Sequence, residues 1–123
     1  MASKRLSSEE VTGVDLTCID ILGTEWSVFW YEKELPDGSD NWGYCHKDKN
    51  YIEIVVNPID RMQELDTFLH ELFHAIWHEY KRGEIETEEN AVTILSSGFT
   101  KVILHNPKLI NYLLVIENDA NEK

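Results

Sequence analysis

The sequence predicts an α+β fold in a single domain, with a small sheet of three or four strands packed on helices. Two observations lead to this prediction. Short segments with alternating apolar residues fill the first half of the 123-residue chain, and longer segments with helical spacing fill the second half. A chain of this length can build one modest hydrophobic core. We therefore expect a flexible N-terminus at 1–12, one domain at 13–116 and a polar tail at 117–123.

Four segments of the first half have the character of strands. Residues 14–22 and 26–31 alternate well enough to pair as a hairpin around Gly23-Thr24. Residues 42–46 and 51–56 flank a polar turn, and the second of these segments is rich in β-branched residues. The sequence therefore predicts two hairpins, or a meander, before any helix.

The first helix is expected to run from about residue 61 to residue 81. Asp60 can cap its first turn, and Gln63 stands at the position that completes a capping box. Gly83 is suited to end the helix.

Two further helices follow. Several glutamates suit the positive start of a second helix near 84–87, and apolar residues continue its pattern as far as residue 103. Asn106-Pro107 breaks this helix. Pro107 also fits the first turn of a short last helix at 108–116.

The first helix carries the sequence His70-Glu71-Leu72-Phe73-His74, which has the His-Glu-x-x-His pattern. Residues four apart lie on the same face of a helix, so both imidazoles can reach one Zn²⁺. Glu71 is offset by one residue and is placed to take a proton from metal-bound water. The motif predicts a zinc site with Glu71 as its catalytic base.

A catalytic zinc needs a third protein ligand from outside this motif. His78 lies about 12 Å of helix rise beyond His70, which is too far for one ion to touch both. The acidic start of the second helix is a better source. Glu88 shares a face with apolar residues that should point inward, namely Ala91, Val92 and Leu95. We predict Glu88 as the ligand and keep Glu89 as the alternative.

This order of elements resembles the small gluzincin-type zinc peptidases. It is similar to the minigluzincins and the ImmA/IrrE-type peptidases, and to short phage-encoded metallopeptidases described as SprT-like. The resemblance covers roughly residues 43–114, and its specific parts are residues 66–76, Glu88-Glu89 and residues 97–107. The metzincin extension is excluded, because Trp77 and Tyr80 stand where that class needs Gly and His.

The resemblance implies His70, His74 and Glu88 as zinc ligands and Glu71 as the base. It also implies a small mixed sheet packed on the metal-binding helix, with an edge strand that holds an extended peptide. It also implies a phage or prophage protein. The SprT pattern has a third histidine ligand on a later helix, but His105 is the only histidine after His78 and lies far along the second helix. This departure from the SprT pattern favours a glutamate as the third zinc ligand.

Composition limits the possible partners. The net charge of −12 argues against nucleic acid, and it would favour basic substrate segments. We expect no membrane span and no signal peptide. Cys18 and Cys45 lack metal-binding spacing and fall in predicted strands, which fits a reducing cytoplasm.

The function expected from the sequence is zinc-dependent hydrolysis of a protein or peptide substrate. Four residues are candidates for stabilising the oxyanion, and the sequence does not choose among them: Tyr44, His46, His78 and Tyr80. The alternative is a catalytically silent zinc-binding interaction module. The oligomeric state stays open.

Overall fold

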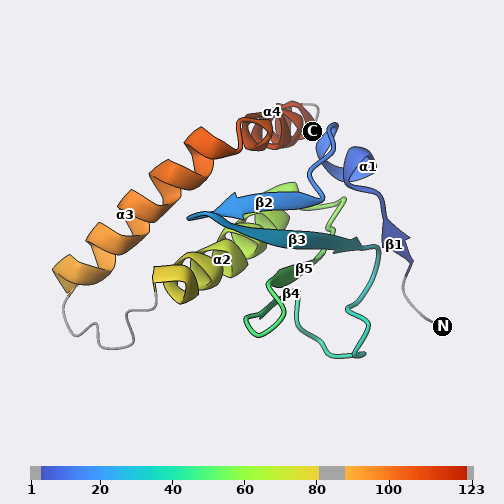
Figure 1. Cartoon of the computed structure of the whole chain (residues 1–123). Coiled ribbons are helices and arrows are strands. Elements are labelled where there is room, and N and C mark those ends of the chain that lie inside the picture. The colour runs from blue at the N-terminus through green and yellow to red at the C-terminus, as the bar shows by residue number, and fades with distance from the viewer. Residues whose placement is uncertain (1–3, 81–87, 122–123) are drawn as a thin grey trace.

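The computed structural model describes residues 4–80 and 88–121 and confirms the α+β class, with a mixed sheet of five strands and helices packed on it (Figure 1). The strands are β1 (Arg5–Leu6), β2 (Cys18–Ile21), β3 (Thr24–Tyr31), β4 (Gly43–His46) and β5 (Tyr51–Val55). The helices are α1 (Ser8–Thr12), α2 (Arg61–Tyr80), α3 (Glu88–His105) and α4 (Lys108–Asn121).

Both predicted hairpins are present in the sheet. β2 pairs antiparallel with β3, and β4 pairs antiparallel with β5. A parallel pairing between β3 and β5, with Trp30 opposite Ile54, joins the two hairpins and makes the sheet mixed. The strand order β1-β3-β5-β4 puts β4 at an edge. An edge strand has main-chain groups that can pair with another chain.

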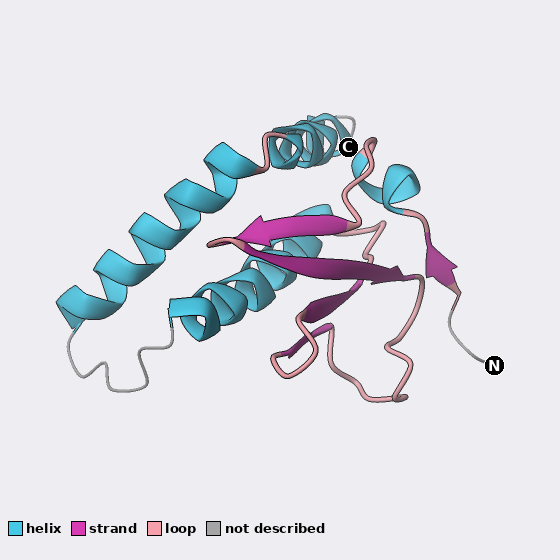
Figure 2. Cartoon of the chain, in the orientation of Figure 1, coloured by secondary structure: helices cyan, strands magenta, loops and turns pink. Residues whose placement is uncertain are grey.

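One face of the sheet packs on the helices, as Figure 2 shows. The alternation in β3 turns Trp26, Val28 and Trp30 to this side, where all three are buried. α2 meets them with one apolar stripe, and the rings of Trp30 and Phe68 stack with centroids 5.7 Å apart. Because α2 is fixed by this core, the opposite border of the same helix has a defined position.

The start of α2 follows the predicted cap in part. The Asp60 carboxylate accepts a hydrogen bond from the Gln63 N–H at 3.1 Å. The Gln63 side chain donates instead to the hydroxyl of Thr67, and the Asp60 N–H is bound by Asn57. The predicted end of this helix at Gly83 and the predicted start of the next at 84–87 lie outside the described residues.

The N-terminal segment departs from the expectation of a loose tail. Residues 5–12 contribute β1 and α1, and the side chain of Val11 is buried in the core. A capping box starts α1, because Ser7 and Glu10 exchange hydrogen bonds of 3.2 and 3.3 Å. The C-terminal segment departs similarly, since α4 continues to Asn121 where we expected a polar tail from residue 117.

Two contacts hold the other helices against α2. α3 runs antiparallel to α2 (Figure 1), and a side chain at Gly98 would collide with Ile76 of α2. Tyr112 of α4 donates a 2.6 Å hydrogen bond to the buried Glu64, whose carboxylate also pairs with Arg61. No helix within residues 4–80 and 88–121 has the length and apolar character to cross a bilayer.

Candidate metal centre

The two histidines of the motif lie side by side on α2, with their Nε2 atoms 3.2 Å apart. Two nitrogens bound to one tetrahedral zinc at the usual bond length would be about 3.3 Å apart. The helix therefore fixes both rings at the separation that a shared metal ion needs. Both side chains are exposed, so an ion can reach them from solvent.

Glu71 completes a compact group with these histidines, and ligand atoms of the three residues all lie within 4.8 Å of one another. Its side chain is buried, and this burial raises the pKa of the carboxyl above its usual range. The positive charges of His70 and Lys47 oppose the increase. Among the described residues, no hydrogen bond to this carboxylate contributes to its pKa, so its oxygens can accept a proton.

The protonation of His74 also suits a metal ligand. Partial burial lowers the pKa of its imidazole, and the positive charges of His70 and Lys47 act in the same direction. A neutral imidazole is the form that binds a metal. The group of His70, Glu71 and His74 could therefore hold a metal ion at neutral pH.

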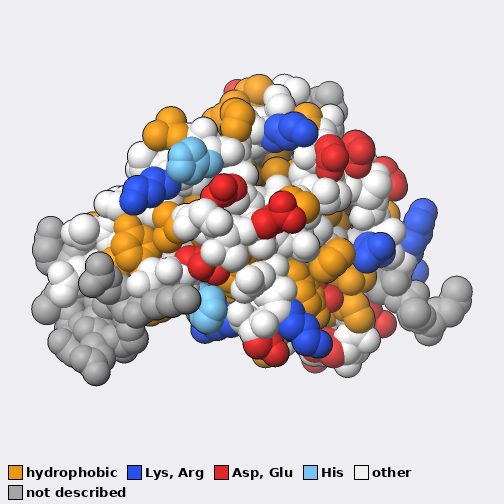
Figure 3. Space-filling view, viewed as in Figure 1, with side chains coloured by type: hydrophobic (Ala, Val, Ile, Leu, Met, Phe, Trp, Pro, Cys, Tyr) orange, Lys and Arg blue, Asp and Glu red, His pale blue; other side chains and the backbone are white. Residues whose placement is uncertain are grey.

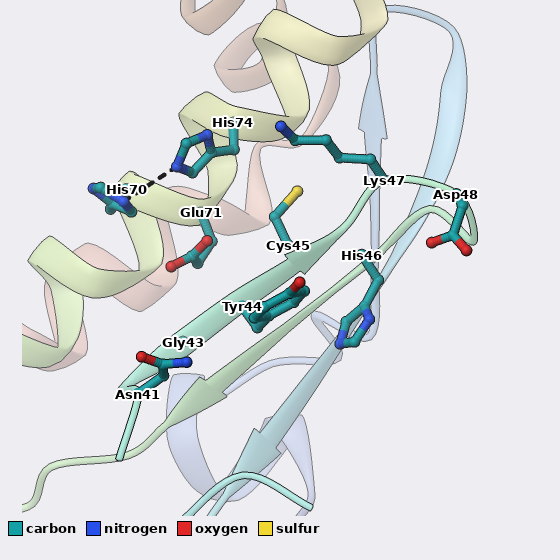
Figure 4. Close-up of a pocket in the computed structure, with 10 residues that line it drawn as sticks. All are labelled: Asn41, Gly43, Tyr44, Cys45, His46, Lys47, Asp48, His70, Glu71 and His74. Atoms are coloured by element: carbon teal, nitrogen blue, oxygen red, sulfur yellow. Dashed lines mark hydrogen bonds between the residues drawn. The ribbon is translucent and has the colours of Figure 1, made fainter. Parts of the chain in front are cut away.

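The group borders an open groove of about 640 Å³ between α2 and the edge strand β4 (Figure 4). The lining residues include His70, Glu71 and His74 on one side and Gly43, Cys45 and Lys47 on the other. A second hollow of about 260 Å³ adjoins it at the His70 end and adds Trp42, Asp66 and Thr67. Together they give the metal group an extended, solvent-open setting.

Gly43 sets the distance between the two walls of the groove. A Cβ at this position would lie 2.8 Å from Thr67 Cγ2 and 3.0 Å from Glu71 Cγ, which is closer than carbon atoms pack. Only a residue without a side chain lets β4 approach α2 this closely beside Glu71.

Cys45 faces the groove from β4, in agreement with its predicted strand position. Burial raises the pKa of its thiol to about 12, and the negative charge of Glu71 adds to the increase. Cys18 is exposed on β2. Neither cysteine belongs to the group of metal-ligating atoms found among the described residues.

Glu88 lies at the start of α3 and is exposed, and it is not part of the group formed by His70, Glu71 and His74. The facing argument that selected it is only partly correct, because Val92 is exposed while Ile94 and Val102 are buried. Its role as a third ligand stays a prediction, and the side chain of its alternative, Glu89, lies outside what the structure describes.

The candidates for oxyanion stabilisation are differently placed. His46 is held by a 2.6 Å contact with Glu53 and a stacked ring contact with Tyr51. Tyr44 packs on His46, and both residues line the groove from β4, although the strand alternation turns them away from the face that carries Cys45. The ring of His78 packs against buried Trp26, and Tyr80 lies at the end of α2 beside Gly98.

Sequence reasoning missed the residues that β4 and the turn after it bring to the groove, above all Gly43 and Lys47. The only signal for them is their position in a predicted edge strand and turn, since nothing local relates them to α2.

Comparison with known proteins gives no family for this chain: no protein-family model, no curated protein and no solved structure matches it. The likeness to zinc peptidases therefore rests on the motif and on the geometry described above.

Proposed function

We propose that this protein is a zinc-dependent peptidase that hydrolyses the amide bonds of an extended peptide. The observation that carries the proposal is the placement of two histidine nitrogens 3.2 Å apart beside a buried carboxylate, in a groove open to solvent. A buried carboxylate with a raised pKa next to paired histidines is typical of a hydrolytic metal site.

Each residue of the group has a role in this reaction. His70 and His74 would hold the ion through their Nε2 atoms. The bound ion would supply a water of lowered pKa and polarise the scissile carbonyl. Glu71 would accept a proton from that water and return it to the departing amine. The raised pKa of Glu71 suits this task, because a base that must also return its proton works best near the ambient pH.

The edge strand β4 supports a peptide as the substrate. It borders the groove, and it pairs with β5 on one side only within the described sheet. An extended peptide can add to such an edge through main-chain hydrogen bonds, which require no particular side chains. The peptide would then pass over Gly43, next to Glu71.

The finer assignment is a gluzincin-type enzyme with Glu88 as the third zinc ligand. Glu88→Gln should then lower zinc affinity at least about tenfold, as loss of one charged ligand does. Glu89→Gln is the matched control, since it changes the neighbouring residue and the same charge. The reverse result would assign the ligand to Glu89. A phage origin and a cytoplasmic location stay predictions.

The second candidate is a catalytically silent zinc-binding module. It is favoured by the composition of the described group, in which the histidines are joined by no further ligand besides the prospective base. Such a protein would retain zinc and bind partners through the same groove without processing them.

The test compares the wild-type chain with Glu71→Gln and His74→Ala. We expect wild type to bind zinc and cleave casein or a peptide library, Glu71→Gln to bind zinc without cleaving, and His74→Ala to lose both properties. Cleavage by Glu71→Gln at the parental rate would contradict the role of Glu71. Zinc binding by wild type with no chelator-sensitive cleavage would favour the silent module.

A further inference from the structure

The groove has one cationic side chain that carries a fixed charge. Among the described residues that line the groove and the hollow beside it, Lys47 is the only lysine or arginine. The chain as a whole has 23 acidic and 11 basic residues, so a lysine at this position is not expected from composition. Figure 4 shows the Lys47 side chain extending from the turn after β4 toward the His74 side of the group.

Lys47 has no partner for its charge in the described part of the protein. The ion pairs there join His46 to Glu53 and Arg61 to Glu64 and Asp119, and none includes Lys47. Its neighbour Asp48 points away from it across the turn (Figure 4). The ammonium group is therefore available to a ligand in the groove.

The charge of Lys47 acts on the centre of the groove. It lines the same groove as Glu71 and His74 on α2 and Cys45 on β4, so its ammonium group faces the space between the two walls. At the opposite end, Asp66 lines the hollow next to His70. Asp48 also lines the groove at the Lys47 end but is directed away from Lys47, so Lys47 is the charged side chain that extends toward the metal centre there, while Asp66 lies at the His70 end. A peptide lying along β4 would meet these charges on opposite sides of the metal centre.

We propose that Lys47 binds a carboxylate of the substrate on the His74 side of the metal centre, so that the groove selects peptides with an acidic group near the scissile bond. This inference rests on the proposed peptidase function and names its substrate class. It is opposite to the preference for basic segments that the net charge of the chain favours. The charge of Lys47 determines the preference at this point, because acidic residues elsewhere on the surface, several of which Figure 3 shows in red on one face, are screened by salt beyond about 8–10 Å.

The carboxylate can come from an Asp or Glu side chain or from a free C-terminus, and both sources have the same chemistry. Capped heptapeptides of alanine and phenylalanine test the first, with one Glu, Gln or Lys moved through each position. The uncharged heptapeptide with a free C-terminus tests the second. Binding is measured by fluorescence anisotropy to the full, zinc-loaded chain carrying Glu71→Gln, which should bind peptides without cleaving them.

We expect one Glu peptide, or the peptide with the free C-terminus, to bind about fivefold more tightly than its neutral counterpart, as for a solvent-accessible ion pair. Adding Lys47→Glu should invert this preference in favour of the Lys peptide. Lys49→Glu is the matched control, because it makes the same change in net charge two residues along the same turn and outside the groove. It should leave the preference as it is.

The outcomes separate this inference from the proposed function. If Lys47→Glu and Lys49→Glu shift the preference equally, or if no preference exists, Lys47 is not a carboxylate-binding residue, even where the wild type hydrolyses the same peptides. If the preference depends on Lys47 but the wild type cleaves none of them, the peptidase proposal fails and the binding site stands. If no peptide binds, both are overturned.

Discussion

Replacing Gly43 by alanine should damage the candidate centre without touching any of its ligands. The new methyl carbon would lie 2.8 Å from Thr67 Cγ2 and 3.0 Å from Glu71 Cγ, whereas carbon atoms pack at about 3.5–4.0 Å. β4 and α2 must therefore separate by about 0.5–1 Å at this point. Overpacking of this kind costs about 1–3 kcal/mol. For a domain of this size, each kcal/mol lowers the melting temperature by about 3–6 °C.

The strain lies between β4 and α2, and this location determines its effect on the centre. His70 and His74 are held by α2 alone, so zinc affinity should change little. Glu71 and the substrate edge of β4 move relative to each other, and a shift of about 1 Å can reduce a rate up to about a hundredfold. We expect calorimetric titration to give nearly wild-type zinc binding, and peptide hydrolysis to fall far more than the loss of folded protein explains.

Two further variants make this reasoning refutable. Thr67→Ser removes the colliding Cγ2 and keeps the hydroxyl that bonds to Gln63 at 2.8 Å, so it should restore part of the stability and activity lost in Gly43→Ala. Gly98→Ala strains α2 against α3 through Ile76, away from the groove, and should lower stability while sparing the rate per folded molecule. A Gly43→Ala protein as stable as wild type, or one not rescued by Thr67→Ser, would refute the close-approach argument.

Three other predictions concern burial. Tyr112→Phe removes the hydrogen bond to the buried Glu64 carboxylate and should cost about 1.5–3 kcal/mol in urea unfolding. A disulfide reagent at pH 8 should modify one thiol rapidly in the native chain, because Cys18 is exposed while the Cys45 thiol has a pKa of about 12; two fast thiols would contradict this burial. In metal-free protein, the raised pKa of Glu71 means that its contribution to stability is present below about pH 4.5 and is lost as the pH rises through the folded value. The stability difference between wild type and Glu71→Gln should follow this course, and a pH-independent difference would contradict it.

The parts of the fold that sequence could predict are those fixed by local periodicity. Alternation in β3 selects Trp26 and Trp30 for the core, and turns at Leu22-Gly23, one residue earlier than predicted, and at 47–50 join the antiparallel hairpins. The parallel pairing of β3 with β5 has no such local signal, because its partners are far apart in the chain. α1 was missed because its stability comes from a capping box and one buried valine in an otherwise polar segment.

The candidate centre likewise has one part that the sequence could predict and another that it could not. A helix places residues four apart on one face whatever surrounds it, so the pairing of His70 with His74 could be read from spacing alone. The orientation of α3 could not be predicted in this way, because it depends on the contact between Gly98 and Ile76 of α2. In this orientation the apolar side chain of Val92 is exposed. Lys47 becomes part of the groove only through the pairing of β4 with β5. The metal group is thus a local property of the sequence, whereas the surface that would select its substrate is a property of the folded sheet.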